Sequence, residues 1–229
     1  MLKEPPLITL RRKFARAPKD LVQRFAGAQT GQIVDAMYGR GALSHEVKPI
    51  DADKAQFAGT ALTVETGPSD NLAIIAALAI AEPGDVIITA SDAFSTTAVV
   101  GDNVSWMAKN KGVVAFVIDG MARDRDGIVG VGLPVFARGI TPNSCVKSGP
   151  GKIGLPIVCA GVSVQSGDIV VGDRDGVVVI PRERAQGVAD ALDEVRRAEV
   201  ETQAKIGKGM THPAWVTELL ASDKVLEVE

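Results

Sequence analysis

The chain has 229 residues, of which 46% are apolar, 23% are charged and only 4% are aromatic, and its formal net charge is −3. This length can bury a sizeable core, and the composition is typical of an ordinary soluble protein. Because no strongly basic block is present, we expect no nucleic acid as the main partner.

The N-terminal half predicts a mixture of helices and strands. Residues 1–17 read as an irregular arm with no apolar segment beside its basic cluster, so we expect no signal peptide. Thr30 is a plausible N-cap of a helix that ends near Gly39. The other expected elements are a short helix over Asp20 to Ala26, a strand over Phe57 to Glu65, a helix capped by Asp70 or Asn71 that runs through Ala81, and a buried strand over Asp85 to Ala90.

The second half is richer in strands. A helix around Val104 to Lys111 is followed by Val113 to Asp119, whose continuous apolar run suits a sheet buried on both faces. Residues 139–154 have the Pro and Gly content of a loop. Further strands are expected over Leu133 to Ala137, Ile157 to Val164, Asp168 to Val171 and Gly176 to Ile180.

A long amphipathic helix is predicted over Glu183 to Ile206, with Val188, Leu192 and Val195 on its apolar stripe. We therefore expect a single domain over residues 1–229, with a core at about 57–181 and a C-terminal helical arm at about 183–220. A neighbouring subunit is the expected surface for that arm. No apolar run reaches the length of a membrane span, so we expect a cytoplasmic protein without a membrane partner.

Histidine and cysteine are scarce, which excludes several kinds of site. His45 and His212 are the only histidines, so a three-histidine zinc site is impossible. Cys145 and Cys159 are the only cysteines, and two do not make a disulfide framework.

The stretch from Val100 to Asp126 is the remaining candidate for chemistry. Gly101-Asp102 opens a predicted helix, where free N–H groups favour a bound carboxylate. Arg123-Asp124 follows the carboxyl end of a predicted strand, where many α/β sheets bind ligands. Arg offers a planar fork for a carboxylate, and Asp offers a hard oxygen for magnesium or manganese. An ordinary helix cap and a surface Arg-Asp pair are the alternative, and spacing alone does not decide between the two.

The spacing of these residues resembles a known signature. Asp102 is separated from Arg123-Asp124 by twenty residues. This Asp-x20-Arg-Asp pattern resembles the 4-hydroxy-4-methyl-2-oxoglutarate / 4-carboxy-4-hydroxy-2-oxoadipate aldolases, of the superfamily like regulator of ribonuclease activity A. The likeness continues in VVAFVIDGMARD, GLPVFARGITPNS and GDIVVGDRDGVVVIP, and it covers about Phe57 to Pro181.

The resemblance implies an α/β fold with an αββα sandwich core and a C-terminal helical extension, assembled as a homo-trimer or hexamer. It implies a class II pyruvate aldolase that acts on 2-oxo acids with a divalent cation, Mg²⁺ or Mn²⁺. The loop that holds the pyruvyl carboxylate corresponds to Gly101, Asp102, Asn103 and Val104. Arg123 would contact the substrate, Asp124 would bind the metal, and Asp102 would line the site.

Further features of the family and of its superfamily bear on this chain. Members often carry Glu three residues after the Arg-Asp pair, where this chain has Gly127. Glu199 or Glu201 of a neighbouring subunit is a candidate to reach the metal. The namesake of the superfamily binds an RNA-degrading endonuclease, so the rival function is a non-enzymatic protein-interaction regulator of RNA degradation. A Schiff-base lysine is the rival mechanism, but Lys109 and Lys111 lie in a polar helix end.

Overall fold

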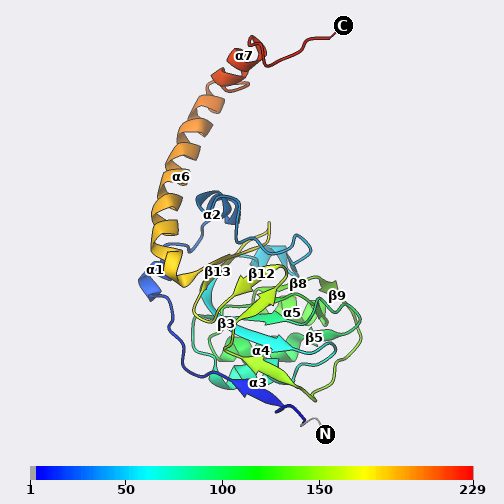
Figure 1. Cartoon of the computed structure of the whole chain (residues 1–229). Helices are drawn as coiled ribbons and strands as arrows, with labels where there is room; N and C mark the ends of the chain where they lie inside the picture. Colours follow the sequence, from blue (N-terminus) through cyan, green and yellow to red (C-terminus); the bar gives the residue numbers. More distant parts are fainter. Residues whose placement is uncertain (1–3, 229) are drawn as a thin grey trace. The chain divides into compact units, whose positions relative to one another are not determined.

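The computed structural model describes residues 4–228, and the contacts of the chain divide it into two compact units (Figure 1). The first unit runs through Leu192, and the second begins at Asp193. All strands of the described residues lie in the first unit. The candidate site therefore has to be sought there.

A nine-stranded sheet forms the centre of the first unit. Its four central strands, β3, β4, β6 and β8, are parallel to one another. Their runs of apolar residues fit a sheet that is buried on both faces. The order along the sheet is β1 (Ile8–Leu10), β10 (Gly151–Ile153), β3 (Phe57–Thr66), β4 (Asp85–Ala90), β6 (Ala115–Ile118), β8 (Val135–Ala137) and β2 (Lys48–Pro49), with β13 (Ile169–Gly172) and β14 (Val177–Ile180) joined through β3.

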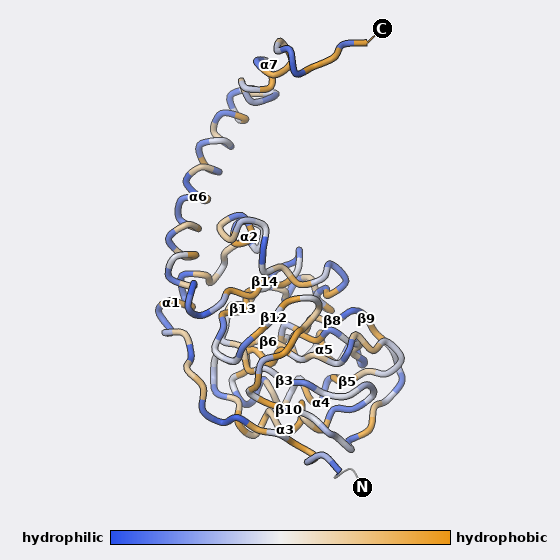
Figure 2. The backbone as a smooth tube through the Cα atoms, viewed as in Figure 1, coloured by the Kyte–Doolittle hydropathy of each residue, from blue (hydrophilic) through white to orange (hydrophobic). Residues whose placement is uncertain are grey.

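Each face of the sheet has its own hydrophobic cluster. On one face, α3 (Leu72–Ile80), α4 (Asp102–Asn110) and α5 (Arg125–Val131) pack on side chains such as Leu62 and Phe116. On the other, β13, β14 and the ribbon of β11 (Ile157–Cys159) and β12 (Val162–Val164) pack on side chains such as Ile88 and Val117. Figure 2 shows hydrophobic residues along the central strands.

A further helix completes the layers of the first unit. Helix α2 (Thr30–Ala36) packs against β14, beyond the second cluster. In order, the layers are the helices α3, α4 and α5, then the central strands of the sheet, then strands β11 to β14, and finally helix α2. The α/β fold expected from the resemblance, with its αββα order and a C-terminal helix, is confirmed.

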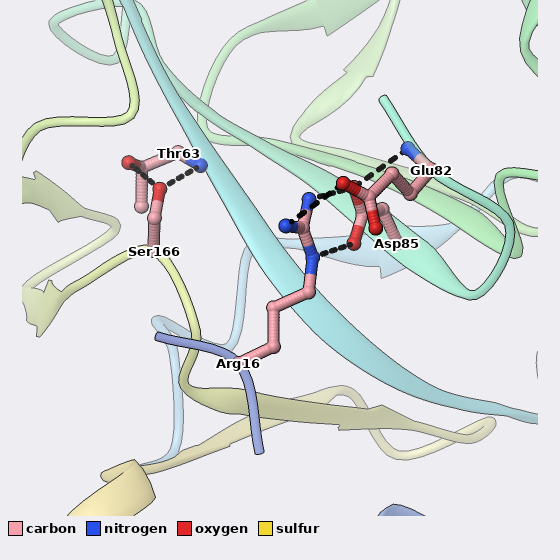
Figure 3. A network of polar contacts seen from close by, with 5 residues as sticks. All are labelled: Arg16, Thr63, Glu82, Asp85 and Ser166. Carbon is pink, nitrogen blue, oxygen red and sulfur yellow. Dashed lines mark hydrogen bonds and ion pairs between the residues drawn. The ribbon is translucent and has the colours of Figure 1, made fainter. Parts of the chain in front are cut away.

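Polar contacts fasten the N-terminal segment to the sheet. Arg16, just before α1 (Lys19–Gln23), contacts the buried Asp85 at 3.0 Å and Glu82 at 3.1 Å (Figure 3). Elsewhere on the sheet, the hydroxyl of Thr63 on β3 lies 2.6 Å from the hydroxyl of Ser166, in the turn between β12 and β13. Because Asp85 opens β4 and is 1% exposed, the Arg16 cation offsets the cost of burying its charge.

Several local expectations were wrong, each for a physical reason. Thr30 is the first residue of α2 rather than its N-cap, because its hydroxyl donates to Asp173 at 2.8 Å instead of capping the helix. The expected strand from Ile157 to Val164 is a hairpin that turns at Ala160 and Gly161, both with positive φ. The expected arm contains β1, and the expected loop at 139–154 contains β9 (Gly139–Ile140) and β10.

The second unit carries the end of α6 (Ala185–Gly207) and α7 (Ala214–Leu220). The expected helix from Glu183 to Ile206 is thus present, preceded by a 3-10 turn at Arg182–Arg184. None of residues 193–228 is buried. Within residues 4–228, no helix has both the length and the apolar character that a membrane crossing requires.

Candidate active site

A small second sheet brings the two halves of the candidate site together. Gly101 directly follows strand β5 (Ala98–Val100), and Arg123 directly follows β7 (Met121–Ala122). These strands pair in parallel, and the Arg123 N–H donates to the carbonyl oxygen of Val100 at 3.0 Å. Gly101 and Arg123 are therefore neighbours, although the sequence indicated neither strand.

All six predicted site residues line one cavity of about 110 Å³. They are Gly101, Asp102, Asn103, Val104, Arg123 and Asp124. The cavity lies between the start of α4 and the start of α5. The helix start and the Arg-Asp pair therefore share one cavity, while the chemical roles of the six residues stay predictions.

Asp124 occupies an unusual backbone position at the start of α5. Its φ of 57° lies in the left-handed region, which Asp and Asn tolerate better than most residues. Its Oδ2 lies 3.2 Å from Nε of Arg123, and the side chain is 41% exposed. The turn thus directs a carboxylate toward the cavity without burying it.

Gly101 leaves the space that Asp124 occupies. A Cβ at Gly101 would lie 2.5 Å from Oδ2 of Asp124 and 3.3 Å from Cγ of Arg123. Real Cβ atoms do not approach an oxygen so closely, so any larger residue would displace the carboxylate. The glycine in this motif is required by contact with the Arg-Asp pair rather than by backbone freedom, because its φ is −135°.

Arg123 is held on two sides by the protein. Its Nε faces Asp124, and its Nη1 donates to the hydroxyl of Ser144. A guanidinium has five N–H donors, so others remain for a ligand. The side chain is 39% exposed, which leaves it accessible to an anion that enters the cavity.

Asp102 begins α4, as the sequence predicted. Its Oδ1 accepts a hydrogen bond from the N–H of Asn103 at 2.6 Å. A Cβ at Gly127 would lie 2.6 Å from Oδ2 of Asp102, so the glycine lets α5 pass close to this carboxylate. The Glu common in the resembling aldolases would not fit at this position while Asp102 keeps its place.

Asn71 is a site residue that the sequence did not reveal. It is 7% exposed and lines the cavity, and its Nδ2 donates to the Val99 carbonyl oxygen at 3.1 Å. Its Oδ1 is buried and has no hydrogen-bond partner among the described residues. A buried acceptor without a donor is costly, so water or a ligand group must complete it.

The expectation that Asp70 or Asn71 caps α3 explains why Asn71 was missed. Asn71 occupies the N-cap position but makes no side-chain cap bond. The carboxylate of Asp70 accepts the Leu72 N–H instead, at 2.8 Å. The amide of Asn71 is thereby free to face β5 and the cavity.

Ser144, Cys145 and Lys147 also line the cavity, and they come from the segment that was expected to be a simple loop. Burial raises the pKa of the Cys145 thiol, whereas the nearby charges of Lys147 and Arg123 lower it. Burial also raises the pKa of Cys159, far above its ordinary range, so neither thiol is an activated nucleophile.

The fold and the cavity define an α/β protein with a polar cavity between two helix starts. The chain belongs to the RraA-like family, whose Aldolase/RraA model matches residues 30–179. The expected family is thereby confirmed.

Similar proteins and solved structures support the assignment to this family. A protein of Halalkalibacterium halodurans, provisionally named 4-hydroxy-4-methyl-2-oxoglutarate aldolase, is 37% identical over 83% of this chain and 89% of its own length. Among solved structures, Streptomyces coelicolor RraAS2, described as an unusual member of the RNase ES inhibitor RraA family, has a TM-score of 0.75 and 26% identity over 83% of this chain and all (100%) of its own. The RNA-processing inhibitor RraA from Thermus thermophilus has a TM-score of 0.62 and 28% identity over 67% of this chain and 93% of its own.

Proposed function

We propose that this chain is a divalent-metal-dependent, class II pyruvate aldolase. It cleaves 4-hydroxy-2-oxo acids, such as 4-hydroxy-4-methyl-2-oxoglutarate or 4-carboxy-4-hydroxy-2-oxoadipate, to pyruvate and a second oxo acid. The observation that carries the proposal is the single cavity shared by Gly101, Asp102, Arg123 and Asp124. The names of several relatives support it.

The donor set fits Mg²⁺ or Mn²⁺ better than zinc. Among the described residues, no three His, Cys, Asp or Glu side chains are grouped so as to hold a metal. Magnesium commonly takes only one or two protein carboxylates and completes its shell with water and substrate oxygens. Asp124, which is partly exposed at the cavity, would hold the cation, and Asp102 lies on the same cavity. When bound, the cation supplies Lewis-acid polarisation of the 2-oxo group.

The protein's own groups have separate tasks in cleavage. The first N–H groups of α4 bind the carboxylate of the substrate, since a helix start offers unpaired donors and a positive dipole end. Arg123 places a fixed positive charge beside the oxygen that becomes negative as the pyruvate enolate forms. Asp102 holds the water that takes the proton of the 4-hydroxyl group when the C3–C4 bond breaks.

The Schiff-base alternative has little support from the lysines. Lys109 lies over the ring of Trp106 at 5.4 Å and donates to the carbonyl oxygen of Val131 at 2.5 Å. Lys147 lines the cavity, but it is exposed. A Schiff-base lysine needs a desolvated amine.

Oxaloacetate provides the first test of the proposal. Its decarboxylation also breaks a C3–C4 bond and leaves a pyruvate enolate, so we expect metal-dependent pyruvate release from both oxaloacetate and a 4-hydroxy-2-oxo acid. Pyruvate formation is measured with Mg²⁺ or Mn²⁺, and the metal-only rate is subtracted. Brisk cleavage of the hydroxy acid without any excess decarboxylation would contradict a shared enolate.

The rival function is inhibition of RNA processing, because two structural neighbours are named as inhibitors of RNA-processing enzymes or as members of such a family. It is tested by adding the chain to an RNA-degrading endonuclease reaction. Inhibition of that reaction, together with no pyruvate release at any metal concentration, would favour the interaction protein over the aldolase.

We also propose that the chain forms a homo-trimer or hexamer. The second unit exposes many apolar side chains, namely Val200, Ile206, Trp215, Leu219, Leu220, Val225, Leu226 and Val228. Exposed apolar surface of this extent is typical of an interface. Light scattering at micromolar concentration should give three or six times the chain mass of 23.9 kDa. A mass of one chain at all concentrations would contradict the proposal.

A further inference from the structure

Asp70 is a buried carboxylate that takes no direct part in the proposed chemistry. It is 4% exposed and does not itself line the cavity. Its Oδ1 accepts the N–H of Leu72 at 2.8 Å, and its Oδ2 accepts the N–H groups of Ser148 and of Gly149, the latter at 2.9 Å. Charge-assisted bonds are stronger than neutral ones. One side chain therefore ties the start of α3 firmly to residues 144–149, which we call the wall segment.

Both parts of the chain that Asp70 joins carry residues of the cavity. Asn71 directly follows Asp70, and its buried Oδ1 has no hydrogen-bond partner among the described residues. On the wall segment, Ser144 and Cys145 line the cavity, and the hydroxyl of Ser144 accepts a hydrogen bond from Nη1 of Arg123. The position of the Asp70 carboxylate thus bears on two walls of the cavity at once.

Further bonds hold the backbone around this carboxylate. The hydroxyl of Thr66, which is 2% exposed, donates to the carbonyl oxygen of Asp70 at 2.7 Å. The N–H of Val146 donates to the carbonyl oxygen of Ser69 at 2.8 Å, and the N–H of Asn71 donates to the carbonyl oxygen of Val146 at 3.0 Å. Asp70 therefore has a fixed place from which it can hold the wall segment.

We propose that Asp70 is a positioning residue of the cavity, which sets the places of the Arg123 guanidinium and the Asn71 amide by fixing the wall segment against α3. The assignment rests on the proposed function, in which Arg123 stabilises the charge of the forming enolate. A small displacement of such a group weakens transition-state stabilisation more than ground-state binding. Loss of the Asp70 carboxylate therefore lowers kcat more than it raises KM.

Asp70→Asn tests this role because it keeps the size of the side chain. One acceptor oxygen becomes an NH2 group, which cannot accept a backbone N–H, so the bonds to α3 or to the wall segment are lost. We expect kcat for 4-hydroxy-4-methyl-2-oxoglutarate to fall about thirty- to a hundredfold, whereas KM rises less than about threefold. Wild-type kcat in a folded Asp70→Asn variant would overturn the inference.

Asp168→Asn is the matched control. Asp168 is also a buried carboxylate, at 5% exposed, and it accepts the N–H groups of Gln165 at 2.8 Å and of Arg182 at 3.0 Å. Neither bond reaches a residue of the cavity. This variant should lower the melting temperature much as Asp70→Asn does, but keep the kcat and KM of the wild type. An equal fall of kcat in both variants would reflect a general loss of stability and would contradict positioning by Asp70.

The thiol of Cys145 gives a measurement that does not depend on turnover. Cys145 is half-buried on the wall segment, whereas Cys159 is fully buried and serves as an internal reference. We expect dithiobis(2-nitrobenzoate) to label Cys145 about tenfold faster in Asp70→Asn, because local opening exposes the wall segment. Burial raises the pKa of this thiol, and the charge of Asp70 raises it further. Labelling is therefore measured over a pH series and compared as the rate constant of the thiolate.

Thr66→Val separates the charge of Asp70 from its position. It keeps the carboxylate and removes only the hydroxyl that holds the carbonyl oxygen of Asp70. We expect a fall in kcat of about three- to tenfold, together with faster labelling of Cys145. If Asp70→Asn does not fold, wild-type kcat and labelling in Thr66→Val would overturn the inference. If the wild type releases no pyruvate, the proposed function fails by itself, and an unchanged labelling rate in the variants would then refute the role of Asp70.

Discussion

Asp124→Asn should abolish metal-dependent pyruvate release, by about a thousandfold or ~4 kcal/mol of transition-state stabilisation, while the protein stays folded. Asn has the size of Asp and tolerates the φ of 57° found at this position. It lacks the negative charge that a hard divalent cation requires and that faces Arg123. The measurement is pyruvate release across a Mn²⁺ titration, with thermal unfolding to verify the fold.

Asp126→Asn is the control for this prediction. Asp126 lies in the first turn of the same helix, is exposed and does not line the cavity. Asp124→Ala is a poorer test, because Ala at a positive φ adds a backbone cost of about 1 kcal/mol. Wild-type rates in Asp124→Asn, or wild-type activity that survives exhaustive chelation, would refute the class II assignment.

Gly101→Ala should lower kcat/KM at least about a hundredfold, or ~2.7 kcal/mol. The added methyl group would start 2.5 Å from Oδ2 of Asp124, so the carboxylate has to move. The backbone at φ −135° accepts Ala, and the effect is therefore steric and confined to the cavity. The expected signature is a weaker apparent affinity for Mn²⁺ together with a nearly unchanged melting temperature.

Gly130→Ala provides the matched comparison. Gly130 lies in α5, and a Cβ there would meet nothing within 4 Å. Ala inside a helix is more favourable than Gly by roughly 0.5–1 kcal/mol, so this variant should be active and slightly more stable. If both variants retained wild-type kcat/KM, the close contact between Gly101 and Asp124 would have no bearing on turnover.

The central strands could be predicted from the sequence because their patterns are long. The apolar run of β4 matches the expected strand from Asp85 to Ala90 residue for residue. Helix α5 was missed because its sequence, RDGIVGV, contains two glycines that lower helix propensity. Its formation depends on packing: Ile128 and Val131 are buried against the sheet.

Only some residues of the candidate site could be predicted from the sequence. Asp102, Arg123 and Asp124 could be found because their spacing forms a motif. Asn71 and Lys147 could not, because tertiary bonds of Asp70 and Val146 bring them to the cavity. The pairing of β5 with β7, which joins the two parts of the motif, involves strands too short to give a periodic pattern.

Strand β3 has consequences for how the chain can fold during synthesis. Its partner β4 follows it closely, but Gly59 pairs with Val170 and Val64 pairs with Ile153. One edge of this apolar strand therefore stays open until most of the chain has left the ribosome. Contacts of such long sequence separation form slowly, and an open apolar edge is prone to aggregation. Nascent chains that end before β10 should thus depend on chaperones, a vulnerability that disappears once β10 and β13 close the edge.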